Sequence, residues 1–151
     1  MNKRTLGIAL LIIFTASLLL VAGIHAGTKV DDQFHMNSPY KHKKSLSLFT
    51  HKKHSVDYKI GCGECHHDDK GEPLNDLQAG DDVQTCFECH SKPGELKGKK
   101  AKGLSKKEKR AYHANAVHEN CRVCHRKVNK EKQAKVAPVK CTECHPKKKK
   151  K

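Results

Sequence analysis

All eight cysteines of the chain fall into four Cys-x-x-Cys pairs, and a histidine follows directly after every pair. The cysteines are Cys62 and Cys65, Cys86 and Cys89, Cys121 and Cys124, and Cys141 and Cys144. Cys-x-x-Cys-His is the attachment sequence of a c-type haem, in which two thiols add to the haem vinyl groups and the histidine binds the iron. The pattern therefore predicts four covalently bound haem c groups, which constrain the fold more than any other feature of the sequence.

Other uses of paired cysteines explain less of this pattern. Disulfides suit an exported chain, but they give no reason for a histidine after each second cysteine. Zinc uses Cys-x-x-Cys pairs two at a time, again without the adjacent histidine. A thioredoxin-like redox pair needs a strand and helix context that is absent from the sequence. Haem attachment accounts for all four histidines, and the predicted proximal iron ligands are His66, His90, His125 and His145.

The remainder of the sequence could not build a sizeable core by itself. Charged residues make up 31% of the 151 residues and aromatic residues 5%, and the apolar residues concentrate in the first 26 positions. Low hydrophobicity with high net charge is typical of disordered chains. A domain of this kind folds when a cofactor supplies the missing core, so we expect closely packed haems to form most of the interior.

The N-terminus predicts export. Lys3 and Arg4 precede an uncharged apolar run over 6–24, and a small-residue cleavage site ends at Ala26. Residues 1–26 are therefore interpreted as a signal peptide, with an uncleaved membrane anchor as the alternative. In a bacterial cell, export places the remaining chain in the periplasm. We divide it into a polar arm over 27–48, a haem domain over 49–146 and a basic lysine tail over 147–151.

Four further histidines stand close to attachment motifs and are candidates for the distal face of the irons. They are His51, His54, His67 and His118. Met1 and Met36 are the only methionines, so four haems with His and Met ligands are impossible. An iron with histidine on both faces has no open position, and it lacks the potential-raising effect of methionine. The sequence thus predicts low-potential haems that pass electrons, and no catalytic residues.

A helix is expected just before the third motif. Ser105 and Glu108 form a capping box, and the helix should run from there to about His118. Ala111 and Ala114 would then lie on the side that carries His118. His113 is the alternative distal ligand on this helix, whereas His35 and His42 of the arm are expected to be solvated side chains.

Phe49-x-His51-x-x-His54, followed by Cys-x-x-Cys-His-His and three further motifs, resembles the tetrahaem cytochrome c3 family (class III) over 49–145. The uniform two-residue spacing of the cysteines is similar to variants related to trihaem cytochrome c7. The resemblance implies a small, mainly α-helical fold with much irregular loop around four haems, and a short β-hairpin near the N-terminus. It also implies the ligand pairs His51 with His66, His67 with His90, His54 with His125, and His118 with His145.

The net charge of +15 favours acidic redox partners. Lys140, Lys147 and the tail cluster beside the fourth motif, where we expect docking. The resemblance implies periplasmic hydrogenase, formate dehydrogenase or a membrane-bound multihaem complex as partner, in anaerobic respiration. An exported protein has no expected role with nucleic acid, and contact with the membrane would be through an uncleaved N-terminal segment alone. Two alternatives are a membrane-anchored quinol-oxidising tetrahaem subunit and a multihaem reductase with one open iron site.

Overall fold

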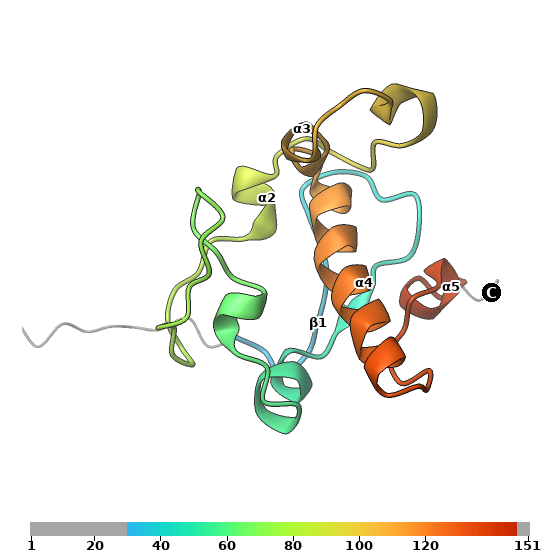
Figure 1. Cartoon of the computed structure of the whole chain (residues 1–151). Helices are drawn as coiled ribbons and strands as arrows, with labels where there is room; N and C mark the ends of the chain where they lie inside the picture. Colours follow the sequence, from blue (N-terminus) through green and yellow to red (C-terminus); the bar gives the residue numbers. More distant parts are fainter. Residues whose placement is uncertain (1–29, 148–151) are drawn as a thin grey trace, which may run out of the picture.

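The computed structural model describes residues 30–147, so the predicted signal peptide and most of the lysine tail lie outside the described residues. The longest element is helix α4, His113–Glu131, and the shorter elements and loops are arranged around it (Figure 1). The others are β1 (Phe34–His35), β2 (Leu48–Phe49), η1 (Lys53–Asp57), η2 (Cys62–Glu64), α2 (Cys86–Cys89), η3 (Gly98–Ala101), α3 (Lys106–Arg110) and α5 (Cys141–Cys144). The predicted fold class, mainly helical with much irregular loop, is confirmed.

A two-stranded antiparallel sheet confirms the expected hairpin near the N-terminus. Phe34 pairs with Phe49, and His35 pairs with Leu48. The two phenylalanine rings meet edge to face with centroids 5.6 Å apart, a favoured geometry for cross-strand aromatic pairs. The second strand of the hairpin leads directly into the turn that carries His51 and His54, so the hairpin positions the first two candidate ligands.

Each attachment motif lies on a helical turn. The first forms η2, the second forms α2, the fourth forms α5, and the third lies within α4. Residues three apart share one side of a helical turn, so both cysteines of a motif face the same way. In two motifs the glutamate before the second cysteine also caps the turn: Glu88 accepts from the backbone N–H of Thr85 (2.8 Å), and Glu143 accepts from that of Lys140 (2.9 Å).

The helix expected from Ser105 to His118 is wrong as a single element. Its start is as predicted, since the backbone N–H of Glu108 donates to the Ser105 hydroxyl (3.2 Å). The helix nevertheless ends at Arg110, and α4 begins at His113. The backbone of Lys92 lies at the break, accepting from His113 N–H (2.8 Å) and donating to the carbonyl of Ala111 (3.0 Å). This tertiary pairing overrides the local helical preference, so Ala111 does not share a helix with His118.

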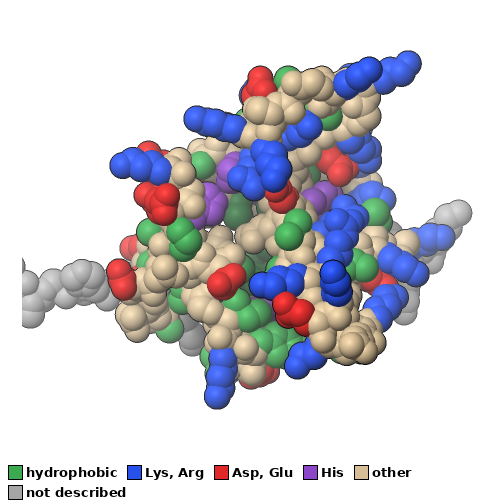
Figure 2. Space-filling model, in the orientation of Figure 1, with side chains coloured by type: hydrophobic (Ala, Val, Ile, Leu, Met, Phe, Trp, Pro, Cys, Tyr) green, Lys and Arg blue, Asp and Glu red, His purple; other side chains and the backbone are tan. Residues whose placement is uncertain are grey.

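No apolar side chain among residues 30–147 is buried by protein. Charged side chains cover the outside instead, and Figure 2 shows lysines and arginines spread over the visible face, most densely over α3, α4 and the segment that precedes α3. Within the described part of the chain, no helix is both long and apolar enough to cross a bilayer. A fold of this kind, with helices but without an apolar protein core, fits a chain that packs around bound groups.

Candidate haem-binding site

The four cysteine pairs converge on the same region of the molecule. All eight cysteines are free thiols, none of them fully buried. Burial is the larger of two causes that together raise the pKa of Cys121 to about 11, and the other is the charge interaction with the thiols of Cys65, Cys144 and Cys86. Those three cysteines belong to the other three motifs, which shows that residues from all four motifs come within electrostatic reach of one another.

The predicted proximal and distal histidines lie in four facing pairs. Each pair joins a histidine that directly follows a motif with one that stands elsewhere in the chain. The ring centroids are 6.5 Å apart for His51 and His66, 5.9 Å for His67 and His90, 6.2 Å for His54 and His125, and 6.1 Å for His118 and His145. An iron about 2 Å from each imidazole nitrogen, with each ring centre about 1 Å beyond, would place the ring centres roughly 6 Å apart.

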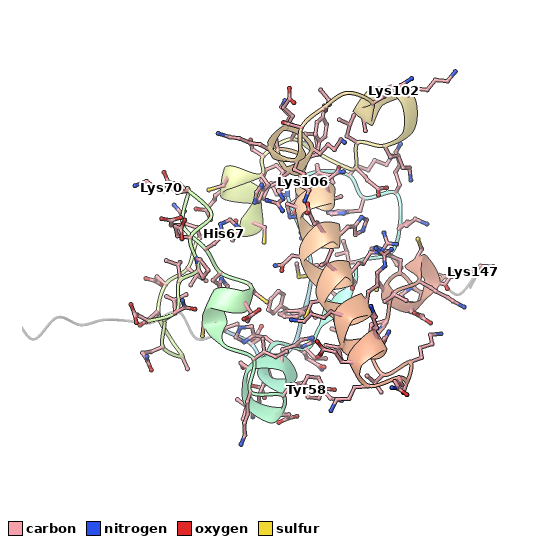
Figure 3. The ribbon with its side chains drawn as sticks, viewed as in Figure 1. Tyr58, His67, Lys70, Lys102, Lys106 and Lys147 are labelled. Atoms are coloured by element: carbon pink, nitrogen blue, oxygen red, sulfur yellow. The ribbon has the colours of Figure 1, made fainter. Side chains whose placement is uncertain are left out.

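These pairs coincide with those implied by the family resemblance, although ligation itself stays a prediction. His67 lies on the side of its loop that faces α2, the helix of the second motif, while Lys70, Lys102 and Lys147 project outward (Figure 3). His54 comes from the turn at η1, and its partner His125 comes from α4. The arrangement therefore links separate parts of the chain two by two, as shared irons would require.

Backbone carbonyls hold several of these rings in one tautomer. Nδ1 of His54 donates to the carbonyl of Thr50 (2.8 Å), and Nδ1 of His67 donates to the carbonyl of Asp68 (2.7 Å). Nδ1 of His145 likewise donates to the carbonyl of Ser45 (2.7 Å). A carbonyl can only accept, so the proton lies on Nδ1 and Nε2 keeps its lone pair. Metal-binding histidines have this second-shell arrangement, which orients the ring and leaves Nε2 as the donor atom.

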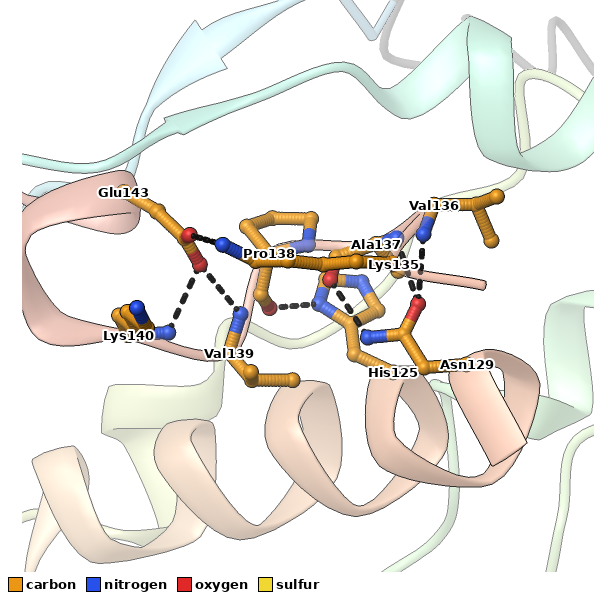
Figure 4. A network of polar contacts seen from close by, with 9 residues as sticks. All are labelled: His125, Asn129, Lys135, Val136, Ala137, Pro138, Val139, Lys140 and Glu143. Atoms are coloured by element: carbon orange, nitrogen blue, oxygen red, sulfur yellow. Dashed lines mark hydrogen bonds and ion pairs between the residues drawn. The ribbon is translucent and has the colours of Figure 1, made fainter. Parts of the chain in front are cut away.

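His125 is held by a polar network between α4 and α5 (Figure 4). Its Nδ1 donates to the carbonyl of Pro138 (2.7 Å). Asn129, one turn further along α4, donates to the carbonyl of Ala137 and accepts from the backbone N–H groups of Val136 and Ala137 (2.8 Å each). The network fixes the path of the chain from the third motif to the fourth.

Glu143 completes this network from within α5. Its carboxylate forms an ion pair with Lys135 and accepts from the backbone N–H groups of Val139 and Lys140. The Lys135 hydrogen bond, followed by the two backbone donors, lowers the pKa of Glu143 to about 2. The roles of Asn129 and Glu143 were not predicted from the sequence. Two signals were available: an amide side chain near the end of a helix, and a glutamate three residues after an N-cap position.

The structure separates the two candidates His113 and His118. His118 faces His145, and its Nδ1 lies 3.3 Å from Oε1 of Glu95. His113, at the start of α4, has only 7% of its surface exposed, and its ring nitrogens lie within hydrogen-bond distance of two hydroxyl groups. Burial, then the nearby His42, lowers the pKa of His113. The geometry favours His118 as a ligand of the fourth haem.

The arm histidines do not share one environment. His35 is exposed, as expected. His42 is half-buried, its ring stacks on Tyr40 with centroids 4.6 Å apart, and Nε2 lies 3.2 Å from the carbonyl of Ser38. The expectation of a solvated His42 is therefore wrong, because the arm folds back on the haem domain instead of extending into solvent.

The side chains present fit haem better than a bare metal ion. Within 30–147, no group of three or more His, Cys, Asp or Glu side chains is arranged around one ion position. Pairs of facing imidazoles suit an iron whose other four ligands come from a porphyrin, and free cysteine pairs next to them suit thioether attachment. The donor set, its tautomers and its spacing thus agree with the prediction from the motifs.

Comparison with known proteins gives one result that covers most of the chain. A sequence model of the class III cytochrome C family matches residues 27–145, a range that includes the arm as well as all four motifs. A search of curated proteins finds no match for the chain.

Proposed function

Because this chain belongs to the class III cytochrome c family, we propose that it is a low-potential electron carrier with four bis-histidine haems. Membership of the family makes it a multihaem electron-transfer protein with covalently bound haem c. The observation that carries the finer proposal is the set of four histidine pairs with ring centroids 5.9 to 6.5 Å apart. Four such pairs would provide both axial ligands for four irons.

The residues of the chain act by attaching, orienting and enclosing the haems. The eight cysteines supply the thioether bonds, and each proximal histidine follows its motif. Carbonyl groups hold Nδ1 protonated and direct Nε2 of the ligand histidines toward the iron position, as at His54 and His67. The bound haems supply reversible one-electron chemistry. With a histidine on each face, no position on the iron would be left for a substrate, which supports a carrier over a reductase.

Close spacing of the haems follows from the shared supports. His66 and His67 are neighbours in sequence but face different partners, His51 and His90. His51 and His54 lie on one turn and face partners in the first and third motifs. Each short stretch of chain would therefore hold two irons, so that the charge on one haem affects the reduction of the next.

We assign the protein to the periplasm on its N-terminal sequence and infer an acidic redox partner from its charge. Lys140 and Lys147 are exposed and flank the fourth motif, and the net charge of the chain is +15. A positive surface beside one haem steers an acidic protein toward that haem and favours fast association. Periplasmic hydrogenase, formate dehydrogenase and membrane-bound multihaem complexes are the partner classes that we propose.

A pyridine haemochrome titration of the purified holoprotein, combined with its intact mass, tests the proposal. We expect four haems per chain and a low-spin spectrum at every iron. Fewer than four haems would contradict the assignment of the motifs. Carbon monoxide binding to the reduced native protein would reveal an open iron and would favour the multihaem reductase instead. A mass that retains residues 1–26 would favour the membrane-anchored, quinol-oxidising subunit.

A further inference from the structure

Ser38 and His113 are the only two buried residues within 30–147, with 8% and 7% of their surfaces exposed. They stand 75 positions apart, Ser38 in the arm and His113 at the start of α4. The Ser38 hydroxyl lies 3.1 Å from Nε2 of His113, and the Tyr40 hydroxyl lies 2.9 Å from Nδ1. The protein thus buries one polar contact more completely than any apolar side chain in the described structure.

Both hydroxyl groups contact the ring of His113: that of Tyr40 lies at Nδ1, and that of Ser38 lies within 3.4 Å of both ring nitrogens. A hydroxyl group can donate or accept, so Ser38 and Tyr40 accommodate either tautomer of the neutral ring. A buried histidine that is fully hydrogen-bonded to hydroxyl groups of a distant segment holds that segment in place, because breaking the contact leaves buried polar atoms without partners.

The segment held in this way lies against the second attachment motif. The ring of Tyr40 is 5.7 Å from that of Phe87, and the ring of Phe87 is 5.6 Å from that of His113. Phe87 stands between Cys86 and Cys89, so its ring belongs to α2, the helix of the second attachment motif. The backbone pairing of Lys92 with the start of α4 ties the chain after this motif to the same cluster.

We propose that His113 is a positioning residue that fixes arm residues 38–42 as a cover against α2, the helix that would attach a haem at Cys86 and Cys89. The inference rests on the proposed function for the presence of that haem. An iron–porphyrin centre carries one positive charge when ferric and none when ferrous, so water stabilises the oxidised form. By excluding water from this side of the second motif, the cover would raise the potential of the haem bound there relative to an exposed one.

The double variant Ser38→Ala/Tyr40→Phe tests the cover, because it removes both hydroxyl groups, keeps the aromatic ring and leaves every predicted ligand unchanged. Two measurements are made on the holoprotein: hydrogen exchange of the backbone amides of 36–42, and a redox titration in which NMR resolves the individual haems. We expect arm exchange to become roughly tenfold faster through the loss of two buried hydrogen bonds. We also expect the potential of the second haem to fall more than that of any other haem.

Tyr58→Phe is the matched control, since Tyr58 is exposed and no hydrogen bond of its hydroxyl is seen in the described structure. It should leave arm exchange and the second potential at their wild-type values. Unchanged hydrogen exchange of the arm in the double variant would show that the hydroxyl contacts with His113 do not hold the arm. Faster exchange with an unchanged potential of the second haem would show that the arm does not tune that haem. If the double variant does not accumulate, Tyr40→Phe alone is judged by the same two readouts. A wild-type protein without a haem at Cys86 and Cys89 would instead refute the proposed function.

Discussion

The two halves of the haem domain support their histidines in different ways. In the N-terminal half, Nδ1 of His54 bonds a carbonyl four residues away and Nδ1 of His67 bonds that of its neighbour. In the C-terminal half, His125 bonds a carbonyl 13 residues away and His145 one that is 100 residues away. Ring orientation is therefore a local property near the first motif and a tertiary property near the last two.

This difference has a physical consequence for stability and redox behaviour. A local hydrogen bond closes a short loop at little entropic cost, so it can form before the rest of the fold is complete. A bond across 100 residues forms only in the assembled structure. Changes in the N-terminal half should therefore act on the haem that they touch, whereas changes in the C-terminal half should also affect the cohesion of the fold.

The largest expected effect is on a ligand of the N-terminal half. His67→Met replaces the histidine that faces His90. Methionine raises haem potentials relative to histidine, so the potential of the haem attached at Cys86 and Cys89 should rise by on the order of 0.1 V, within the ~0.8 V span that axial ligands cover. A haem-resolved redox titration measures the shift.

The exposed His35 provides the control for this substitution, and His35→Met should leave all potentials unchanged. If His67→Met leaves the second haem bis-histidine and its potential unchanged, His67 is not its ligand. A large loss of global stability in the same variant would contradict the view that support in the N-terminal half is local.

The next effect concerns the long-range support in the C-terminal half. Asn129→Ala removes three hydrogen bonds that hold 136–137 against α4. At about 1 kcal/mol net for each bond, and with partial compensation by water, we expect a loss of about 2 kcal/mol in the free energy of unfolding. Denaturant unfolding of the holoprotein, followed by circular dichroism, measures the loss.

Asn129→Asp refines this test, because a carboxylate keeps the acceptor for the two backbone N–H groups and loses only the donor to Ala137. Its loss of stability should be smaller than that of Asn129→Ala. Equal losses for the two variants would show that the acceptor contributes nothing. A loss near zero for Asn129→Ala would remove the distinction between the two halves.

The sequence was most informative where structure is local. The attachment motifs and the capping box at Ser105 depend on residues that are close together in the chain, and the structure has the capping box as predicted. The four histidine pairs coincide with those implied by the family resemblance, because such a resemblance carries tertiary information that periodicity lacks. The break at Ala111 and the burial of Ser38 were missed, because both depend on partners far away in sequence.

The smallest effect tests whether the N-terminal half is supported by local contacts alone. Gly63 lies between the cysteines of the first motif, and a Cβ added there would clash with Oδ1 of Asn75 and come within 3.1 Å of Cβ of Pro73. The Asn75 side chain must turn away and Pro73 must give slightly to accept Gly63→Ala, which should cost about 1 kcal/mol of unfolding free energy by overpacking. Gly61→Ala is the matched control, since nothing lies within 4 Å of its Cβ position. Equal stabilities for the two variants would mean that Asn75 and Pro73 move aside at no cost. A cost well above that of Asn129→Ala would show that packing holds the N-terminal half as strongly as the hydrogen-bond network holds the C-terminal half.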